Sequence, residues 1–347
     1  MRSDRWNRIR QPALAAAAAL SLLLPAGGAQ AQAVNLYTTR EPGLIKPLLE
    51  AFTASSGIKV NTVFVKDGLA ERVAAEGARS PADVLMTVDS GTLVELVDKG
   101  ITQPIKSSAL EAAIPAAMRD VGGHWFALSM RARIVYASRE RVKLDTITYE
   151  DLAEPKWKGK ICVRSGQHPY NTALVANLIA RSGEAAAEAW LKGVKANLAR
   201  KASGGDREVA RDILGGICDI GIGNSYYVGL MRSGKGGPDQ KRWGDAINAV
   251  MPRFKDGGTH VNASGAAVAK NAPNKANAVK LLEYLVTDAA QDAYARVNFE
   301  YPVKAGAPVD SIIASLGKLV ADTTPLTEIA RNRRKASLLS DKVGFDN

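Results

Sequence analysis

ICDIGIGNSYY, the sequence of residues 217–227, combines the signals of a buried strand and of a ligand-binding turn. Ile220 and Ile222 alternate with glycines, as in a strand crowded by its neighbours. Asn224 and Ser225 favour turns and helix caps, so the two tyrosines after them are expected where a strand passes into a helix. Ligands of open α/β folds bind at the carboxyl ends of strands. The tyrosine pair is therefore a candidate binding site, although one core and one surface tyrosine would give the same pattern.

A third tyrosine, Tyr170, has the same spacing from a cysteine as Tyr226 has. Cys162 lies eight residues before Tyr170, and Cys218 lies eight residues before Tyr226, each in a predicted strand. If these two strands are neighbours in one sheet, Tyr170 joins Tyr226 and Tyr227 at the same edge. The spacing therefore predicts a cluster of three phenols.

The first residues have the three parts of a secretory signal peptide. A basic start precedes an apolar run at 13–24, and residues 29–33 offer two small-x-small cleavage sites. The apolar run is short for a membrane span, and no second long apolar run follows it. We therefore assign residues 1–31 to a cleavable signal peptide, which predicts an exported, soluble mature chain.

Cys162 and Cys218 are the only cysteines of the chain. A single pair in an exported protein is a disulfide candidate, because the compartment is oxidising. We expect a bond between them that ties together the two strands leading to the tyrosines. Two free buried thiols are the alternative.

Strand and helix signals alternate along the predicted mature chain. Residues 34–38, 58–65 and 82–88 read as strands separated by helices, which predicts a parallel sheet with helices on its faces. Asp67 is expected to cap the helix after the second of these strands. The same alternation returns after residue 155 and leads to the tyrosine pair.

Two further segments read as crossings between domains. The first comprises residues 125–130 and 134–137, which read as two extended runs around the sequence Arg-Ala-Arg. The second is residues 249–254, which also read as extended. We predict an α/β fold of two doubly wound lobes, joined by hinge strands around a cleft. The amino-terminal lobe is assigned residues 32–128 and 255–296, and the carboxyl-terminal lobe residues 129–254 and 297–347.

Composition narrows the class of function. The 347 residues carry a net charge of +11, which suits an anion, a membrane surface or an acidic partner. No basic run is interleaved with aromatic residues, so nucleic acid is not expected as a partner. The chain also lacks the common nucleophile, P-loop and zinc-protease motifs, so we do not expect an enzyme. The three histidines, His124, His168 and His260, show no metal-ligand spacing.

Three converging phenols favour a hard, highly charged cation. Soft ions prefer thiolates, and Ca²⁺ and Mg²⁺ prefer carboxylates and carbonyls. Because the pKa of a free tyrosine is about 10, only a strong Lewis acid holds several of them deprotonated at neutral pH. Fe(III) meets that requirement. The alternative is that the rings stack on an organic ligand.

Over the whole predicted mature length, the chain resembles the ferric-iron-binding proteins of bacterial ABC importers. The most specific matching piece is NSYY, which contains the tyrosine pair. The resemblance implies a bilobal, transferrin-like periplasmic-binding-protein fold in which Tyr226 and Tyr227 hold Fe(III), with Tyr170 as the third tyrosine of the family's tyrosine-rich branch. The other matching pieces are NLYTTR at 35–40, SPADVL at 80–85, MRAR at 130–133, YN at 170–171 and GTHVN at 258–262.

The ligand from the first lobe departs from that family's pattern. Family members place a histidine or tyrosine just after the first strand, where this chain has Glu41 and Pro42. Glu41 offers a hard carboxylate oxygen and is a candidate fourth ligand, or else a glutamate that favours the start of a helix. Some members use a glutamate after the third strand, where Val88 stands next to Asp89, so no ligand is expected there.

Several members of the family complete the coordination with a synergistic anion such as carbonate. By position, Ser165, Gly166 and Asn224 are candidates for holding it. Ser165 and Gly166 precede a predicted helix, whose amino terminus favours an anion. Arg131 or Arg133 would add a bidentate contact, or would form an interlobe salt bridge instead.

The resemblance implies a monomeric periplasmic protein that captures ferric iron in an interlobe cleft and delivers it to an ABC permease in the inner membrane. The alternative keeps this fold and binds an organic cation, such as thiamine or a polyamine, with Asp89 and Glu41 facing the amine. The colour of the protein separates the two hypotheses, because a ferric phenolate absorbs visible light.

Overall fold

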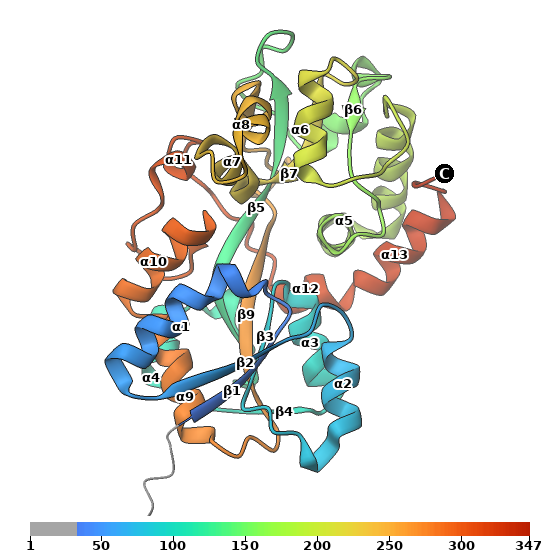
Figure 1. Ribbon diagram of the computed structural model, residues 1–347. Coiled ribbons are helices and arrows are strands. Elements are labelled where there is room, and N and C mark those ends of the chain that lie inside the picture. The colour runs from blue at the N-terminus through green and yellow to red at the C-terminus, as the bar shows by residue number, and fades with distance from the viewer. Residues whose placement is uncertain (1–32) are drawn as a thin grey trace, which may run out of the picture. The chain divides into compact units, whose positions relative to one another are not determined.

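The computed structural model describes residues 33–347 (Figure 1). Residues 1–32, and with them the predicted signal peptide, lie outside the described residues. The strands are β1 (Ala33–Thr38), β2 (Lys59–Phe64), β3 (Val84–Thr87), β4 (Thr102–Gln103), β5 (Phe126–Ser138), β6 (Ile161–Cys162), β7 (Ile220–Asn224), β8 (Ile247–Val250), β9 (Val261–Ala269) and β10 (Tyr301–Pro302). They form one mixed sheet in the order β2-β1-β3-β9-β5-β7-β6, while β4 pairs with β9, and both β8 and β10 pair with β5.

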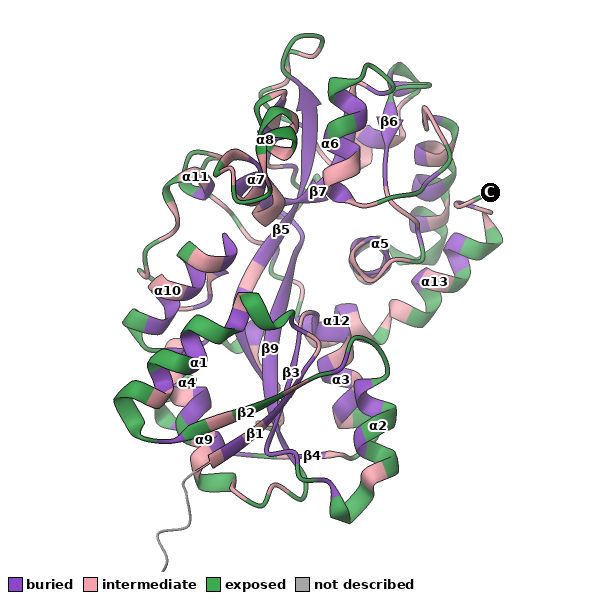
Figure 2. Cartoon of the chain, viewed as in Figure 1, coloured by how far each residue is buried: buried purple, intermediate pink, exposed green. Residues whose placement is uncertain are grey.

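Helices cover the strands. They are α1 (Pro42–Ser56), α2 (Leu69–Glu76), α3 (Ser90–Asp98), α4 (Ser108–Ala113), α5 (Pro169–Ala196), α6 (Asp206–Leu214), α7 (Ser225–Arg232), α8 (Pro238–Asp245), α9 (Lys275–Leu285), α10 (Asp288–Asn298), α11 (Ser311–Ala314), α12 (Leu326–Arg331) and α13 (Arg333–Lys342). Figure 2 shows β5, β7 and β9 buried, while the helices around them keep exposed outer faces. Because β3 and β9 are buried along their whole length, both faces of these strands are covered.

One long strand connects the two ends of the sheet. The first half of β5 pairs with β9, and its second half pairs with β7 and β8. The sequence-based prediction of two separate extended runs around Arg131 and Arg133 was wrong, because β5 continues through both arginines. Their guanidinium groups do not interrupt the strand, since each finds a buried carboxylate partner, Glu300 for Arg131 and Asp206 for Arg133.

Local sequence explains the helix boundaries near the tyrosines. α5 begins at Pro169, which has no N–H to satisfy, and the His168 ring before it accepts a hydrogen bond from the Tyr170 backbone N–H. Gly183 interrupts α5 with a positive φ of 83°, so a kink divides this helix into two parts. The expected cap by Asp67 was wrong, because Gly68 precedes α2 and no side chain caps that helix.

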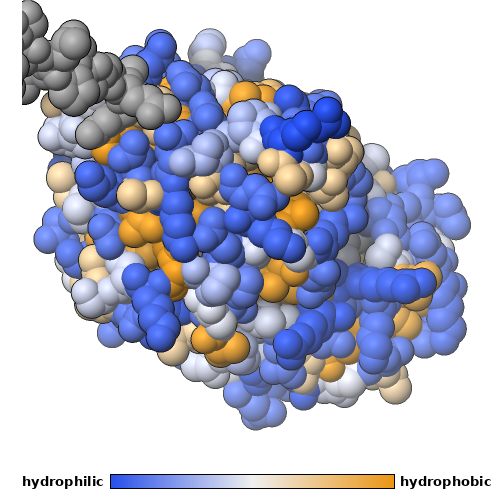
Figure 3. Space-filling model, turned by 90° about the horizontal axis from the view of Figure 1, so that it is seen from below, coloured by the Kyte–Doolittle hydropathy of each residue, from blue (hydrophilic) through white to orange (hydrophobic). Residues whose placement is uncertain are grey.

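The buried apolar residues of the described chain form two clusters. The larger one joins β1, β3 and β9 to α5, and the smaller one packs Ile134 and Tyr136 of β5 against Val228 of α7 and the two cysteines. Seen from below, the surface is mainly polar with small separate apolar patches (Figure 3). None of the helices within residues 33–347 combines the length and the hydrophobicity that crossing a bilayer requires.

Candidate metal centre

The structure brings the three predicted tyrosines together. β6 and β7 are parallel neighbours, and α5 and α7 start beyond their carboxyl ends. Tyr170 is the second residue of α5, and Tyr226 and Tyr227 lie in the first turn of α7. The phenol oxygens of Tyr170 and Tyr226 are 3.4 Å apart, and the ring centroids of Tyr226 and Tyr227 are 4.1 Å apart. Three hard oxygen donors therefore meet at one sheet edge.

A disulfide links the chain segments that lead to these tyrosines. Cys162 ends β6, and Cys218 lies two residues before β7, with a Cα–Cα distance of 5.8 Å. The predicted pairing is confirmed. The bond spans 56 residues of sequence and so restrains the two strands relative to each other.

The tyrosines line a cavity of about 340 Å³. Glu41, the residue that precedes α1, lines the same cavity, as does Val88 after β3. The cavity is thus lined both by the edge formed by β6 and β7 and by residues that follow β1 and β3, of which Glu41 offers a carboxylate. The other lining residues are Thr39, Arg40, Leu44, Arg131, Arg207, Leu230, Lys235, Gly236, Gln240 and Glu300.

Without a cation, the site favours neutral phenols. Burial raises the pKa of Tyr226 well above its usual value, and the neighbouring phenols of Tyr170 and Tyr227 raise it further. Burial also raises the pKa of Tyr227 to about 12, with Tyr170 and Asp206 adding to the shift. Deprotonation of these side chains at neutral pH therefore requires a strong positive charge at the phenol oxygens.

Arginines surround the phenol cluster. The guanidinium carbons of Arg131 and Arg164 each lie 5.1 Å from the Tyr170 ring centroid. The guanidinium carbon of Arg207 lies 5.6 Å from the Tyr227 ring centroid. These guanidinium groups therefore place positive charge beside the rings of Tyr170 and Tyr227, within cation–π range.

Arg131, a predicted anion contact, lines the cavity and belongs to a buried ion cluster around Glu300. Its Nη1 lies 3.6 Å from a Glu300 carboxylate oxygen and donates to Ser264. Arg40 also pairs with Glu300, at 2.9 Å, and Ser129 donates to the same carboxylate. Within residues 33–347, the Nε and Nη2 atoms of Arg131 are buried and have no hydrogen-bond partner. These two donors are suited to an oxyanion.

Arg133, the other predicted anion contact, is engaged elsewhere. It does not line the cavity, and it donates to Asp206 at 2.5 Å, to Asn171 at 2.6 Å and to Asn224 at 3.1 Å. Asn224 in turn donates its backbone N–H to Asp206 at 2.9 Å. The contacts therefore favour Arg131 over Arg133 for a ligand.

A carboxylate of the chain itself occupies the donors predicted before α5. The Gly166 N–H donates to Asp346 at 2.6 Å, and the Ser165 hydroxyl donates to the same carboxylate. The ring of Phe345 lies where a Cβ at position 166 would stand, which explains the glycine there. This part of the loop thus holds the carboxyl-terminal tail.

Asp89 and His260, both considered in the sequence analysis, have structural partners. Asp89 caps α3 and pairs with Arg333 at 3.0 Å, and it does not line the cavity. The buried His260 ring is hydrogen bonded to Asn177. No group of three or more His, Cys, Asp or Glu side chains with metal-binding geometry occurs among the described residues.

Sequence reasoning missed Glu300 and Asp206. Each is a single carboxylate that becomes important only through arginines distant in sequence, so no local spacing reveals it. The weak signal for Glu300 is an isolated charge between two aromatic residues, Phe299 and Tyr301.

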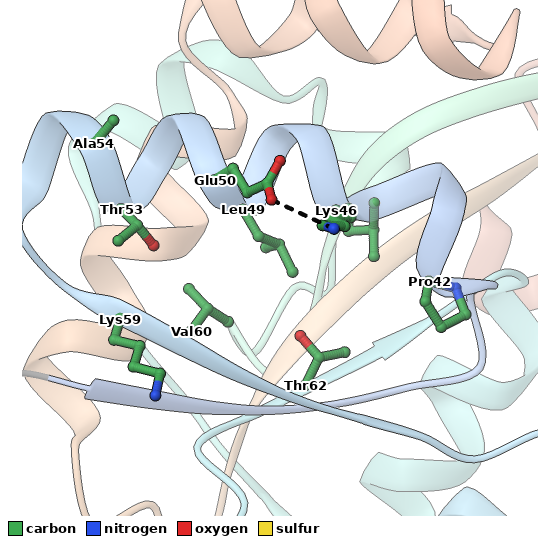
Figure 4. Close-up of a pocket in the computed structure, with 10 residues that line it drawn as sticks. Pro42, Lys46, Leu49, Glu50, Thr53, Ala54, Lys59, Val60 and Thr62 are labelled. Atoms are coloured by element: carbon green, nitrogen blue, oxygen red, sulfur yellow. Dashed lines mark ion pairs between the residues drawn. The ribbon is translucent and has the colours of Figure 1, made fainter.

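A second cavity, of about 540 Å³, lies between α1 and β2 (Figure 4). Leu49 and Val60 face each other there, and Lys46 and Glu50 form an ion pair of 3.6 Å. This cavity contains no phenol and has none of the chemistry described above.

The chain belongs to a family of bacterial extracellular solute-binding proteins, whose sequence profile matches residues 79–315. Its fold is the α/β periplasmic-binding-protein fold of ferric-binding proteins, as predicted. A solved structure described as a Bordetella ferric binding protein has a TM-score of 0.87 and 64% identity, covering 91% of this chain and 100% of that one.

Two further proteins are similar over nearly the whole chain. Iron uptake protein A1 of Synechocystis is 40% identical over 316 residues, which is 90% of this chain and 88% of its own. A Trichodesmium protein solved in complex with iron and citrate has a TM-score of 0.86 and 43% identity, covering 90% of this chain and 99% of that one. These relatives are named for binding and uptake rather than for catalysis.

Proposed function

We propose that this protein captures ferric iron in the periplasm and delivers it to an ABC permease in the inner membrane. The observation that carries the proposal is the meeting of the Tyr170, Tyr226 and Tyr227 phenols in one cavity. Membership in an extracellular solute-binding family and the names of the relatives support the compartment, the metal and the role in uptake.

The ligands we propose are these three tyrosines and Glu41. Iron binds first to the tyrosines, which lie in the carboxyl-terminal lobe as we assign it, and the amino-terminal lobe then brings Glu41 to the metal. Closure requires contacts made only in the closed state, and a bond between Glu41 and iron is such a contact. Residues 129–254 and 297–347 thus form the lobe that receives the metal, and residues 32–128 and 255–296 form the lobe that closes over it.

We assign the anion site to Arg131. Three phenolates and one carboxylate leave coordination positions on Fe(III) open to an anion or water. The unpartnered Nε and Nη2 atoms of Arg131 offer a bidentate contact for a carbonate-type anion beside the metal. Iron binding on this scheme releases the phenolic protons, so the apparent affinity rises with pH.

The test is a titration of the purified protein with ferric citrate, followed by visible absorption. We expect a phenolate-to-iron charge-transfer band that is lost in a Tyr226→Phe, Tyr227→Phe double variant. Tyr284→Phe is the matched control, because Tyr284 packs against Phe52 outside the cavity and should leave the band unchanged.

Binding of an organic cation is less well supported. Of the two carboxylates expected to face an amine, Asp89 caps α3 and pairs with Arg333, and only Glu41 lines the cavity. A colourless protein whose melting temperature rises with thiamine or a polyamine, but not with ferric citrate, would replace the iron proposal with this alternative.

A further inference from the structure

Asp206 is a buried carboxylate that the ligand scheme does not use. It is the first residue of α6, and its side chain is 0% exposed. It accepts hydrogen bonds from Arg133, from Arg164 at 3.3 Å and from the backbone N–H of Asn224 at 2.9 Å. It lies outside the cavity and so has no direct route to a bound metal.

One set of these contacts leads to the tyrosine pair. Asn224 ends β7 and immediately precedes α7, which begins Ser225-Tyr226-Tyr227. The Asn224 side chain makes no capping hydrogen bond to the helix. Instead, its backbone N–H is held by Asp206, and its side-chain oxygen accepts from Arg133 at 3.1 Å. The Asp206 carboxylate therefore fixes the point from which the first turn of α7 departs.

The other set leads to Tyr170. Arg133 donates to the side chain of Asn171, which follows Tyr170 directly, at 2.6 Å. Asn171 in turn donates to the backbone carbonyls of Arg164 and Ser165 in the loop before α5. The guanidinium carbons of Arg164 and Arg133 lie 5.1 and 6.0 Å from the Tyr170 ring centroid. The carboxylate thus orients two of the three arginines that lie near this ring; the third is Arg131.

We propose that Asp206 is a positioning residue of the metal centre, which sets the placement of Tyr170 relative to Tyr226 and Tyr227. This inference rests on the proposed function. The charge of Asp206 has a second effect: it neutralises guanidinium groups that would otherwise repel a trivalent cation bound at the phenols. Loss of a group that orients metal ligands typically lowers metal affinity about 10–100-fold.

The experiment compares Asp206→Asn with Asp212→Asn. Asp212 is a matched control, because it lies on the same helix, is also buried and pairs with Arg200 at 2.7 Å and Arg211 at 2.9 Å, away from the cavity. Ferric affinity is measured by competition with citrate, together with the wavelength of the charge-transfer band. We expect Asp206→Asn to lower the affinity about 10–100-fold and to shift the band. Asp206→Glu should restore part of the affinity, and Asp212→Asn should match the parent protein.

A crystal structure of each metal-free variant supplies a readout that does not depend on iron. The Tyr170–Tyr226 oxygen separation, 3.4 Å in the parent, should increase in Asp206→Asn and persist in Asp212→Asn. If the parent protein shows no charge-transfer band with iron, the proposed function is refuted. The Tyr170–Tyr226 oxygen separation in the metal-free variants still tests the positioning role of Asp206. If Asp206→Asn does not fold, Arg164→Gln, which keeps the Arg133–Asp206 pair, should show a smaller loss of affinity. The inference would be overturned if Asp206→Asn, or Arg164→Gln in its place, had the ferric affinity and the charge-transfer band of the parent protein. An unchanged Tyr170–Tyr226 oxygen separation would overturn it as well.

Discussion

The surroundings of Arg131 and Arg133 differ although both arginines lie on one strand, two residues apart. Both terminal nitrogens of Arg133 donate, to Asp206, Asn171 and Asn224, and only its Nε lacks a partner among the described residues. Arg131 shares Glu300 with Arg40 and keeps two donors without partners among the described residues. The acceptors around the side chain, rather than the residue type or its place on β5, therefore separate a structural arginine from one that is available to a ligand.

Replacing Arg133 should give the largest effect on stability. Arg133→Ala leaves the buried Asp206 carboxylate with Arg164 as its one remaining ion-pair partner, at 3.3 Å. Breaking a buried pair in this way costs about 3–5 kcal/mol. Urea unfolding measures the loss, and Arg200→Ala, which breaks a more exposed pair with Asp212, should cost less. A loss below about 1 kcal/mol for Arg133→Ala would contradict the structural role of this residue.

Removal of the disulfide tests how firmly the strands that lead to the tyrosines are held together. The Cys162→Ala, Cys218→Ala variant opens a loop of 56 residues, and chain entropy predicts a loss of about 4 kcal/mol in the free energy of unfolding. The ferric band of the folded variant should weaken or broaden, because the strands leading to the tyrosines are no longer tied. An unchanged unfolding midpoint would show that the other contacts of β6 and β7 suffice.

Replacing Arg131 should affect binding more than stability. In Arg131→Gln, Glu300 keeps its pair with Arg40 and its hydrogen bond from Ser129. We expect ferric affinity to fall about tenfold in bicarbonate buffer, since the anion loses its bidentate contact. The fall should be smaller in bicarbonate-free buffer. Equal affinities for the variant and the parent in both buffers would remove the anion role of Arg131.

The smallest effect concerns His260, whose backbone oxygen accepts the Arg133 N–H. Burial, together with the charge of Arg133, lowers the pKa of His260 to about 3. Because the unfolded chain binds this proton near pH 6.5 and the folded chain does not, stability is lost as the pH falls from 6.5 toward 3. At pH 5.5 this loss of stability is on the order of 1 kcal/mol. Unfolding of a His260→Asn variant should depend less on pH in this window, and an identical pH profile would contradict the assignment.

Sequence alone predicted those features that repeat locally or follow strand ends. The alternation of strands and helices, the cysteine pair and the convergence of Tyr170 with Tyr226 and Tyr227 all follow from spacing along the chain. The continuity of β5 did not, because charged residues in a buried strand become tolerable only when distant carboxylates neutralise them. Glu300 and Asp206 were missed for the same reason: their partners come from elsewhere in the chain. The occupation of Ser165 and Gly166 by Asp346 likewise depends on the tail folding back onto α5.

The unbroken β5 also decides where this chain can be opened for engineering. A circularly permuted or split version, of the kind used to build optical sensors, cannot begin within residues 126–138 without dividing the hydrogen-bond ladders of β9, β7 and β8. The turn just before the strand is a better place, because Val121 there is 100% exposed and contributes nothing to the buried core. New termini at that turn would leave the whole strand, with both Arg131 and Arg133, on a single fragment.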